Sequence, residues 1–158
     1  MEWQRGEYTI STDRERLSLD VIYGYLSGSS YWAADRPREV VRASLEGSLC
    51  FGVYHADTQV GFARVITDRA TLFHLCDVFI LPGHRGQGLG KWLVGCVLEA
   101  PELAGLRGFL ATRDAHGLYA RFGFQPLQNP NYYMVRPAAK PAPPAEDPPE
   151  TGGSHDRH

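Results

Sequence analysis

The segment HRGQGLGKWL, residues 84–93, constrains the fold most strongly, because it carries three glycines directly after the apolar run VFILP. Beyond the glycines, apolar side chains recur at helical spacing until Pro101. The glycines therefore lie where a strand is expected to turn into a helix. A helix N-terminus exposes unpaired backbone N–H groups and the positive end of the helix dipole, so a glycine-rich turn before it suits an anion. We expect this segment to bind a phosphate-bearing ligand.

Two common phosphate-binding motifs do not fit this segment. A Walker loop needs glycine where the chain has Arg85, and Ser or Thr where it has Trp92. The dinucleotide motif G-x-G-x-x-G ends on Lys91 if it starts at Gly86, and on Leu93 if it starts at Gly88. A nucleotide-binding protein of either type is therefore disfavoured.

The rest of the chain predicts an α+β fold with a largely antiparallel sheet and a crossover helix near its middle. The front half is expected to form two helices and then strands. The predicted helices, besides the one after the glycines, are Leu17–Leu26, Arg38–Leu45 and Ala115–Phe122. The predicted strands are Leu49–His55, Gln59–Thr67, Thr71–Leu81, Gly108–Ala111 and Asn131–Arg136.

Composition favours one globular domain. The chain has 158 residues, of which 43% are hydrophobic, and its formal net charge is −2. This balance gives no basic surface for nucleic acid, and the absence of a long apolar run or signal peptide predicts no membrane span and a cytoplasmic location. Cys50, Cys76 and Cys96 are odd in number and scattered, so we expect reduced, buried thiols and no metal site.

The C-terminal part differs in composition. From Pro137 to His158 the chain is rich in proline and polar residues and has no apolar periodicity. Such a segment cannot bury enough apolar surface to offset its ordering entropy. We therefore predict a domain over residues 1–136 and a disordered tail over residues 137–158.

Arg85, Gly88 and Gly90 form the pattern Arg-x-x-Gly-x-Gly, which resembles the pyrophosphate-binding motif of the GCN5-related N-acetyltransferase (GNAT) superfamily. LCDVFILPGHRGQGLGKWL is similar to that superfamily's strand, proline turn, glycine loop and helix. GLYARFGFQPL, residues 117–127, resembles its later Tyr-x-x-x-Gly-Phe signature. The resemblance implies a GNAT-like mixed, largely antiparallel central sheet flanked by helices.

The resemblance also implies a site for acetyl-CoA. The backbone of Val78, Phe79 and Ile80 would pair with the pantetheine arm, and one of its N–H groups would polarise the thioester. The pyrophosphate would be held by the loop residues Arg85, Gly86, Gln87, Gly88, Leu89, Gly90 and Lys91. Thr112 stands where many relatives have an asparagine that contacts the pantetheine, so its role is open.

Two residues are candidates for catalysis. Tyr119 occupies the superfamily's tyrosine position, and a phenol with an ordinary pKa near 10 could protonate the departing thiolate; the alternative is a core tyrosine. LCDVFI is similar to the Leu-Glu-Asp-Phe-Phe-Val strand of diamine acetyltransferases. Asp77 then matches the second carboxylate and could orient the amine or relay its proton, although pairing with an arginine would also explain an aspartate there.

The acceptor pocket is expected in the loop between the first two helices. Tyr31 and Trp32 could enclose an amine by cation–π attraction, or could instead fill the core. Arg36 would suit an acceptor carboxylate, which favours an amino-acid-like or peptide acceptor. His74 and His116 could accept a proton near pH 7, or could be ordinary surface histidines.

These residues predict an acetyl-CoA-dependent N-acetyltransferase that acts on a primary amine of a small molecule or peptide by direct attack in a ternary complex. A covalent route through Cys76 is disfavoured, because its neighbours Leu75 and Asp77 disfavour a thiolate. The alternative is a non-catalytic acyl-CoA-binding or sensing module on the same fold. A homodimer is possible in either case.

Overall fold

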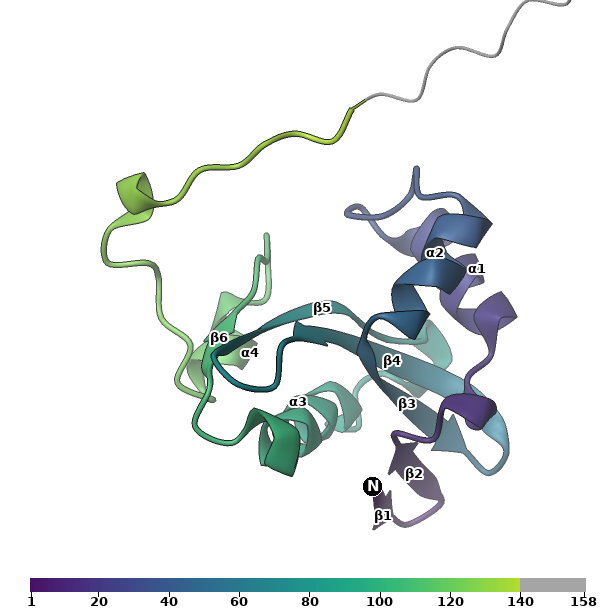
Figure 1. The fold of residues 1–158 in the computed structure, drawn as a ribbon. Helices are drawn as coiled ribbons and strands as arrows, with labels where there is room; N and C mark the ends of the chain where they lie inside the picture. The colour runs from purple at the N-terminus through teal and green to yellow at the C-terminus, as the bar shows by residue number, and fades with distance from the viewer. Residues whose placement is uncertain (140–158) are drawn as a thin grey trace, which may run out of the picture. The chain divides into compact units, whose positions relative to one another are not determined.

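The structure is a computed structural model that describes residues 1–139. Six strands form one sheet in the order β1-β2-β3-β4-β5-β6, and neighbours are antiparallel except for the parallel pair β5 and β6 (Figure 1). The strands are β1 (Glu2–Arg5), β2 (Tyr8–Ser11), β3 (Leu49–His55), β4 (Thr58–Thr67), β5 (Leu72–Ile80) and β6 (Arg107–Phe109). The predicted α+β class with a largely antiparallel sheet is confirmed.

Four α-helices accompany the sheet in the described part of the chain. They are α1 (Leu19–Ser29), α2 (Arg38–Glu46), α3 (Leu89–Glu99) and α4 (His116–Ala120), each within a few residues of its predicted place. Ser18 caps α1, because its side-chain oxygen accepts a hydrogen bond from the Val21 N–H at 3.2 Å. Within residues 1–139, every helix is too short or too polar to cross a bilayer.

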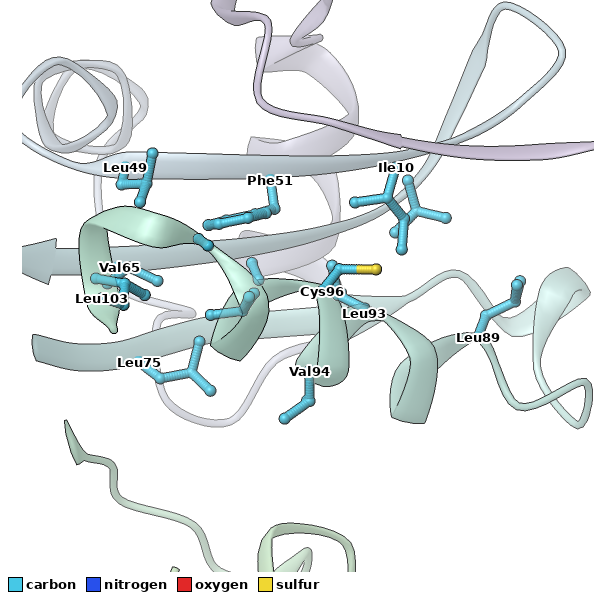
Figure 2. Packing of buried hydrophobic residues seen from close by; sticks show 14 of the residues in the cluster. Ile10, Leu49, Phe51, Val65, Leu75, Leu89, Leu93, Val94, Cys96 and Leu103 are labelled. Atoms are coloured by element: carbon cyan, nitrogen blue, oxygen red, sulfur yellow. The ribbon is translucent and has the colours of Figure 1, made fainter. Parts of the chain in front are cut away.

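The helices cover the sheet from two sides. In Figure 1, α3 lies on one face of the sheet and α1 with α2 lies on the other. Figure 2 shows the larger cluster, in which Leu93 and Cys96 of α3 pack toward Phe51 and Val65 of the strands. Each fully buried side chain of this size stabilises the fold by about 1.5–3 kcal/mol. The second cluster joins Ile22, Leu26 and Val41 to Cys50, Phe62 and Phe79 of the strands.

The N-terminus corrects the sequence-based prediction. The chain begins with the β1–β2 hairpin and not with a helix, and Gly6 turns it with a φ of +57°. Each of these strands has only four residues. In each, a buried or half-buried apolar residue, Trp3 or Ile10, stands among polar residues, and so short a pattern does not distinguish a strand from an irregular polar segment in the sequence. β2 pairs with β3, which adds this hairpin to the edge of the sheet.

The predicted last strand, Asn131–Arg136, is also wrong. Pro130–Tyr132 forms a 3-10 turn, and the residues after it have no regular secondary structure up to residue 139. Proline favours the start of a helical turn, and Met134 and Val135 are exposed, so the apolar run is not buried as a strand face would require. The structure divides at this point into a unit of residues 1–125 and a second unit that begins at Pro126.

The predicted domain boundary at residue 136 stays a prediction. The predicted disordered tail, residues 137–158, lies mostly outside the described residues, which end at residue 139.

A bulge in β5 opens the sheet edge that holds the site. Phe62 of β4 pairs with Phe79 and Arg64 pairs with Cys76, so β5 contains one residue more than β4 between these pairs. Asp77 lies in this bulge with a φ of +53°, a left-handed conformation that aspartate tolerates better than most residues. β6 pairs with residues 72–74 of β5. Among the described strands, the end of β5 therefore has neighbours on one side only.

Candidate active site

Two adjoining cavities lie along this end of β5. The first has a volume of about 620 Å³ and reaches the glycine loop before α3, whereas the second has a volume of about 460 Å³ and reaches the loop between α1 and α2. Several residues line both cavities: Tyr31, Trp32, Val78, Arg113, Asp114, Ala115 and Tyr119. The arrangement is suited to two ligands that meet at a shared wall.

The glycine loop of the first cavity can accept an anion. Gly86 and Gly88 have φ values of +82° and +75°, which a residue with a side chain adopts at a cost. A Cβ atom at either position would meet no atom within 4 Å, so the backbone there faces open space. Gly88 is the N-cap of α3, and no side chain of residues 1–139 caps this helix. The N-terminal N–H groups of α3 are thus free of a side-chain partner and fit a phosphate group.

Most of the predicted cofactor residues line this first cavity: Val78, Phe79, Ile80, Arg85, Gly86, Gly88, Leu89 and Gly90. Three do not. Gln87 donates from Nε2 to the Tyr8 hydroxyl at 3.2 Å, Lys91 is exposed, and Thr112 lines the second cavity. Their predicted contacts with a cofactor stay predictions.

The Arg85 side chain holds the loop in place. Its Nε donates to the Ile80 carbonyl oxygen at 2.9 Å, and its Nη2 donates to the Tyr25 hydroxyl at 2.9 Å. Tyr25 in turn stacks on Phe79 of β5, with ring centroids 4.1 Å apart. One arginine thereby connects the glycine loop to β5 and α1, a role that the sequence motif alone did not indicate.

Tyr119 lies on α4 at the wall between the two cavities. The residue is 8% exposed, and within the described part of the chain its hydroxyl has no hydrogen-bond partner. Burial raises the pKa of Tyr119, and the nearby Tyr31 and Asp114 raise it further. The phenol therefore stays protonated at neutral pH and is available as a proton donor on the border of both cavities.

Asp77 is fully engaged by neighbouring side chains. Its Oδ2 accepts hydrogen bonds from Arg64 Nε at 2.7 Å and Arg36 Nη1 at 3.0 Å, and its Oδ1 accepts one from Trp32 Nε1 at 2.8 Å. Its side chain is 1% exposed. Burial alone would raise the pKa of Asp77, but the hydrogen bond and charge of Arg64, with Arg36 and Trp32, lower it. The carboxylate is thus ionised, and both its oxygens are occupied.

Arg64 is a residue of this site that sequence analysis missed. It lies on β4, is buried, and donates from Nη1 to the Ser48 hydroxyl at 3.1 Å. An arginine within the apolar strand sequence VGFARVI needs a buried carboxylate partner, and this was the signal that could have revealed it. The predicted pairing of Asp77 with an arginine is therefore what the structure contains.

Arg113 is the second missed residue, and it lines both cavities. Its guanidinium lies 3.8 Å above the centre of the Tyr31 ring, and its backbone N–H donates to the Tyr31 hydroxyl at 3.0 Å. Thr112 precedes it and accepts a hydrogen bond from the Ala115 N–H, which shapes the turn into α4. This connection between β6 and α4 offered no sequence pattern that would single out Arg113.

Of the two histidine candidates, only one lies at these cavities. His74 lines the second cavity, whereas His116 is exposed and lines neither cavity. Burial lowers the pKa of His74 and the Arg64 charge lowers it further, against the opposing effect of Asp77, so the imidazole is neutral at pH 7. Burial raises the pKa of the Cys76 thiol to about 11. Residues 1–139 contain no cluster of His, Cys, Asp and Glu able to hold a metal ion.

Comparison with known proteins defines the family. The pattern of the acetyltransferase (GNAT) domain matches residues 46–126, a range that contains the β5 bulge, the glycine loop and Tyr119. A Gibberella zeae protein named as an acetyltransferase is 35% identical, over 75% of this chain and 79% of that protein. This chain therefore belongs to the GNAT acetyltransferase family, whose members use acyl-CoA.

Solved structures have the same fold. A GNAT-family protein from Xanthomonas campestris pv. campestris superimposes with a TM-score of 0.81 and 47% sequence identity, covering 83% of this chain and 93% of that one. A Mycobacterium tuberculosis protein solved in complex with CoA has a TM-score of 0.61 and 17% identity, covering 75% of this chain and 72% of its own. At that identity the second likeness extends to the fold alone.

Proposed function

We propose that this protein is an acetyl-CoA-dependent N-acetyltransferase that holds the acetyl donor in the first cavity and a primary amine in the second. The observation that carries the proposal is Tyr119, a buried and protonated phenol that lines both cavities. A general acid is useful only where the leaving group and the attacking group meet, and this wall is where the two cavities join.

Main-chain groups would hold the donor. The open glycine loop and the uncapped N-terminus of α3 suit the pyrophosphate, and the free side of Val78–Ile80 suits an added strand such as the pantetheine arm. The CoA complex of the Mycobacterium tuberculosis protein with the same fold supports this assignment. The donor supplies the activated acetyl group, and the chain supplies orientation and proton transfer.

The transfer needs one proton given and one removed. The amine nitrogen bonds to the thioester carbon, the carbon–sulfur bond breaks, and Tyr119 donates its proton to the departing sulfur. His74 is the better proton acceptor for the amine, because it is neutral and lines the second cavity. Asp77 is a positioning residue in this scheme, since its occupied oxygens hold Arg36 and Trp32.

Direct attack is favoured over a covalent enzyme intermediate. A nucleophilic cysteine must be ionised, and the pKa of Cys76, near 11, leaves almost no thiolate at neutral pH. Cys50 and Cys96 are buried, and burial raises the pKa of each thiol in the same way, again to about 11.

The test combines binding with turnover. Acetyl-CoA affinity is measured by calorimetry, and release of free CoA is measured with polyamines, aryl amines, aminoglycosides, amino acids and short peptides as acceptors. Tyr119→Phe is expected to lower the turnover number more than about tenfold while acetyl-CoA affinity stays within about twofold. Tyr132→Phe, which removes the hydroxyl of an exposed tyrosine in the second unit, is the matched control.

Each outcome has a definite meaning. An unchanged rate in Tyr119→Phe would remove this residue from the mechanism. Binding of acetyl-CoA without turnover for every acceptor class would favour the non-catalytic acyl-CoA-binding module. Absence of acetyl-CoA binding would overturn the assignment of the glycine loop itself.

A further inference from the structure

The second cavity has an excess of positive charge. Three arginines, Arg36, Arg64 and Arg113, and two aspartates, Asp77 and Asp114, line or adjoin it. Arg64 neutralises Asp77 at 2.7 Å, and the neighbouring His74 is uncharged at pH 7. Arg36 also pairs with Asp77, so among the described residues three arginines stand against the two carboxylates of Asp77 and Asp114, and one positive charge is left over.

The Arg36 guanidinium is only partly used by the protein. One nitrogen, Nη1, donates to Asp77 at 3.0 Å, and the side chain is 25% exposed at the cavity. Within the described residues, its other nitrogens make no hydrogen bond. An arginine held at one nitrogen by a buried carboxylate keeps its remaining donors in a fixed direction, which suits a second anion.

Arg113 carries no carboxylate partner in the part of the chain that the structure describes. It is held instead by the face of Tyr31, and Tyr31 packs edge-on against Trp32 with centroids 5.1 Å apart. Trp32 donates to the same carboxylate as Arg36. Arg113 therefore rests on Tyr31, Arg36 shares the Asp77 carboxylate with the adjacent Trp32, and both arginines line one cavity.

We propose that the acceptor carries a carboxylate close to its amine, as a free amino acid does, and that Arg36 and Arg113 bind this carboxylate. The proposal rests on the proposed N-acetyltransferase function for its chemistry, but it concerns the binding preference of the second cavity. Guanidinium groups pair with carboxylates through short, charge-assisted hydrogen bonds. The aromatic residues Tyr31 and Trp32 would pack against the side chain of such an acceptor.

The charge balance argues against a polyamine acceptor. The strand LCDVFI is similar to that of diamine acetyltransferases, in which an aspartate at the position of Asp77 is expected near a cationic substrate. Here Asp77 is already paired with two arginines and is 1% exposed. A polycation would enter a cavity whose described charged residues sum to one positive charge and whose other carboxylate, Asp114, is exposed to water.

Binding of reaction products tests the proposal without requiring turnover. Calorimetry in the presence of saturating CoA compares N-acetylglycine, N-acetylmethionine and N-acetylphenylalanine with their carboxamides. The two members of each pair have nearly the same size and shape, but the amide has no negative charge and has an NH2 group in place of one acceptor oxygen. At least one acid is expected to bind about tenfold or more tightly than its amide, because a charge-assisted hydrogen bond is lost in the amide. The preference should weaken as salt concentration rises.

Two variants identify the arginines. Arg113→Gln is expected to abolish most of the preference for the acid while CoA affinity stays within about twofold. Arg121→Gln is the matched control, because Arg121 lies on the same segment, is exposed and lines neither cavity. Arg36→Gln is the second variant and should act in the same direction, with thermal unfolding used to confirm that the pair with Asp77 is not needed for folding.

Equal affinity for acid and amide in the wild-type protein, or no binding of either, overturns the proposal. Loss of CoA affinity in Arg113→Gln with the acid preference intact also overturns it, because Arg113, which lines both cavities, would then bind the donor and not the acceptor carboxylate. A clear acid preference together with no CoA release from acetyl-CoA keeps the carboxylate site and overturns the N-acetyltransferase function. Failure of the carboxylate site and failure of the proposed N-acetyltransferase function therefore give different results.

Discussion

The two cavities are built in different ways. The first contains, besides the wall that it shares with the second, the main chain of the glycine loop, the α3 N-terminus and the free side of β5. The second is made of side chains that come from the α1–α2 loop, β5 and the segment before α4. A main-chain site depends on local backbone conformation, whereas a side-chain site depends on contacts between distant segments.

Asp77 contributes to both cavities. The left-handed conformation of Asp77 is part of the bulge that separates β5 from its regular pairing, so it shapes the strand end used by the first cavity. Its carboxylate also holds Arg36 and Trp32 at the second cavity. Substitutions at Asp77 should therefore separate the backbone contribution from the charge contribution.

The largest effect is expected for Asp77→Ala. Removing the carboxylate leaves Arg64 buried without its partner, which should lower the free energy of unfolding by about 3–5 kcal/mol. Asp77→Asn keeps a residue that tolerates the left-handed conformation, so the difference between the two variants contains the backbone cost, about 1–2 kcal/mol, together with the hydrogen bonds that the amide oxygen still accepts. Urea denaturation at pH 7 measures both.

The pH dependence of this effect has a defined sign. The pKa of Asp77 is lower in the folded protein than its ordinary value, so its contribution to stability is complete above about pH 4 and is lost as the pH falls through the folded pKa. As the pH is lowered, the free energy of unfolding of Asp77→Asn should therefore fall less steeply than that of the wild-type protein. Asp20→Asn, at the exposed pair with Arg38, is the control and should cost less than about 1 kcal/mol. Equal costs at Asp77 and Asp20 would contradict a buried network.

The sequence predicted the first cavity better than the second, because the glycine loop of the first cavity is a local feature of the chain. Gly86, Gly88 and Gly90 lie within five residues, and their spacing after an apolar strand reflects a local conformation that any chain with this loop must adopt. The strand, the loop and α3 were therefore found from the sequence and lie close to their predicted bounds. The side-chain fixing of this loop by Arg85 was not predicted, because it needs Tyr25 from another helix.

The second cavity could be predicted only in part. Tyr31, Trp32, Arg36 and His74 were candidates from the sequence and all line it. Arg64 and Arg113 were missed, because their partners are 13 and 82 residues away in the chain; the apolar sequence around Arg64 indicates that it needs a partner but does not identify which residue that is. The β1–β2 hairpin was missed for a related reason, since its position depends on pairing with β3, about forty residues later.

The next effect in size is expected at the glycine loop. Gly88→Ala places a Cβ on a residue whose φ is +75°, so the loop must rearrange and the N–H groups of α3 are turned from the ligand. Acetyl-CoA affinity should fall by between about tenfold and about a hundredfold, the loss expected for hydrogen bonds to a charged group. Calorimetric titration with acetyl-CoA measures this change.

Gly83→Ala is the matched control for the loop. Gly83 precedes the same loop, has no left-handed φ, and a Cβ there would meet no atom within 4 Å. This variant should bind acetyl-CoA as the wild-type protein does. Equal affinity in Gly88→Ala would contradict the main-chain character of the first cavity, and loss of affinity in Gly83→Ala would mean that the binding surface extends beyond the glycines.

The smallest effect is expected at His74, and it concerns the proton that the amine must lose. Because burial and Arg64 lower the pKa of His74, the neutral imidazole is present at pH 7 and is lost only as the pH falls through this lowered pKa, which lies below the ordinary value of about 6.5. The rate constant kcat/KM should therefore fall on the acid side in the wild-type protein. His74→Gln should remove this part of the pH profile and lower the rate by about tenfold at pH 7; the loss is no larger because water in the cavity can partly replace the imidazole.

The competing candidate is His116, which is exposed and lines neither cavity. The acid limb of kcat/KM should persist in His116→Gln and disappear in His74→Gln. Loss of the limb in His116→Gln would transfer the proton acceptor to α4, beside Tyr119, and would mean that one short helix supplies both the acid and the base. If the limb persists in both variants, it belongs to the titration of the acceptor, and the second cavity then selects an amine that is already uncharged.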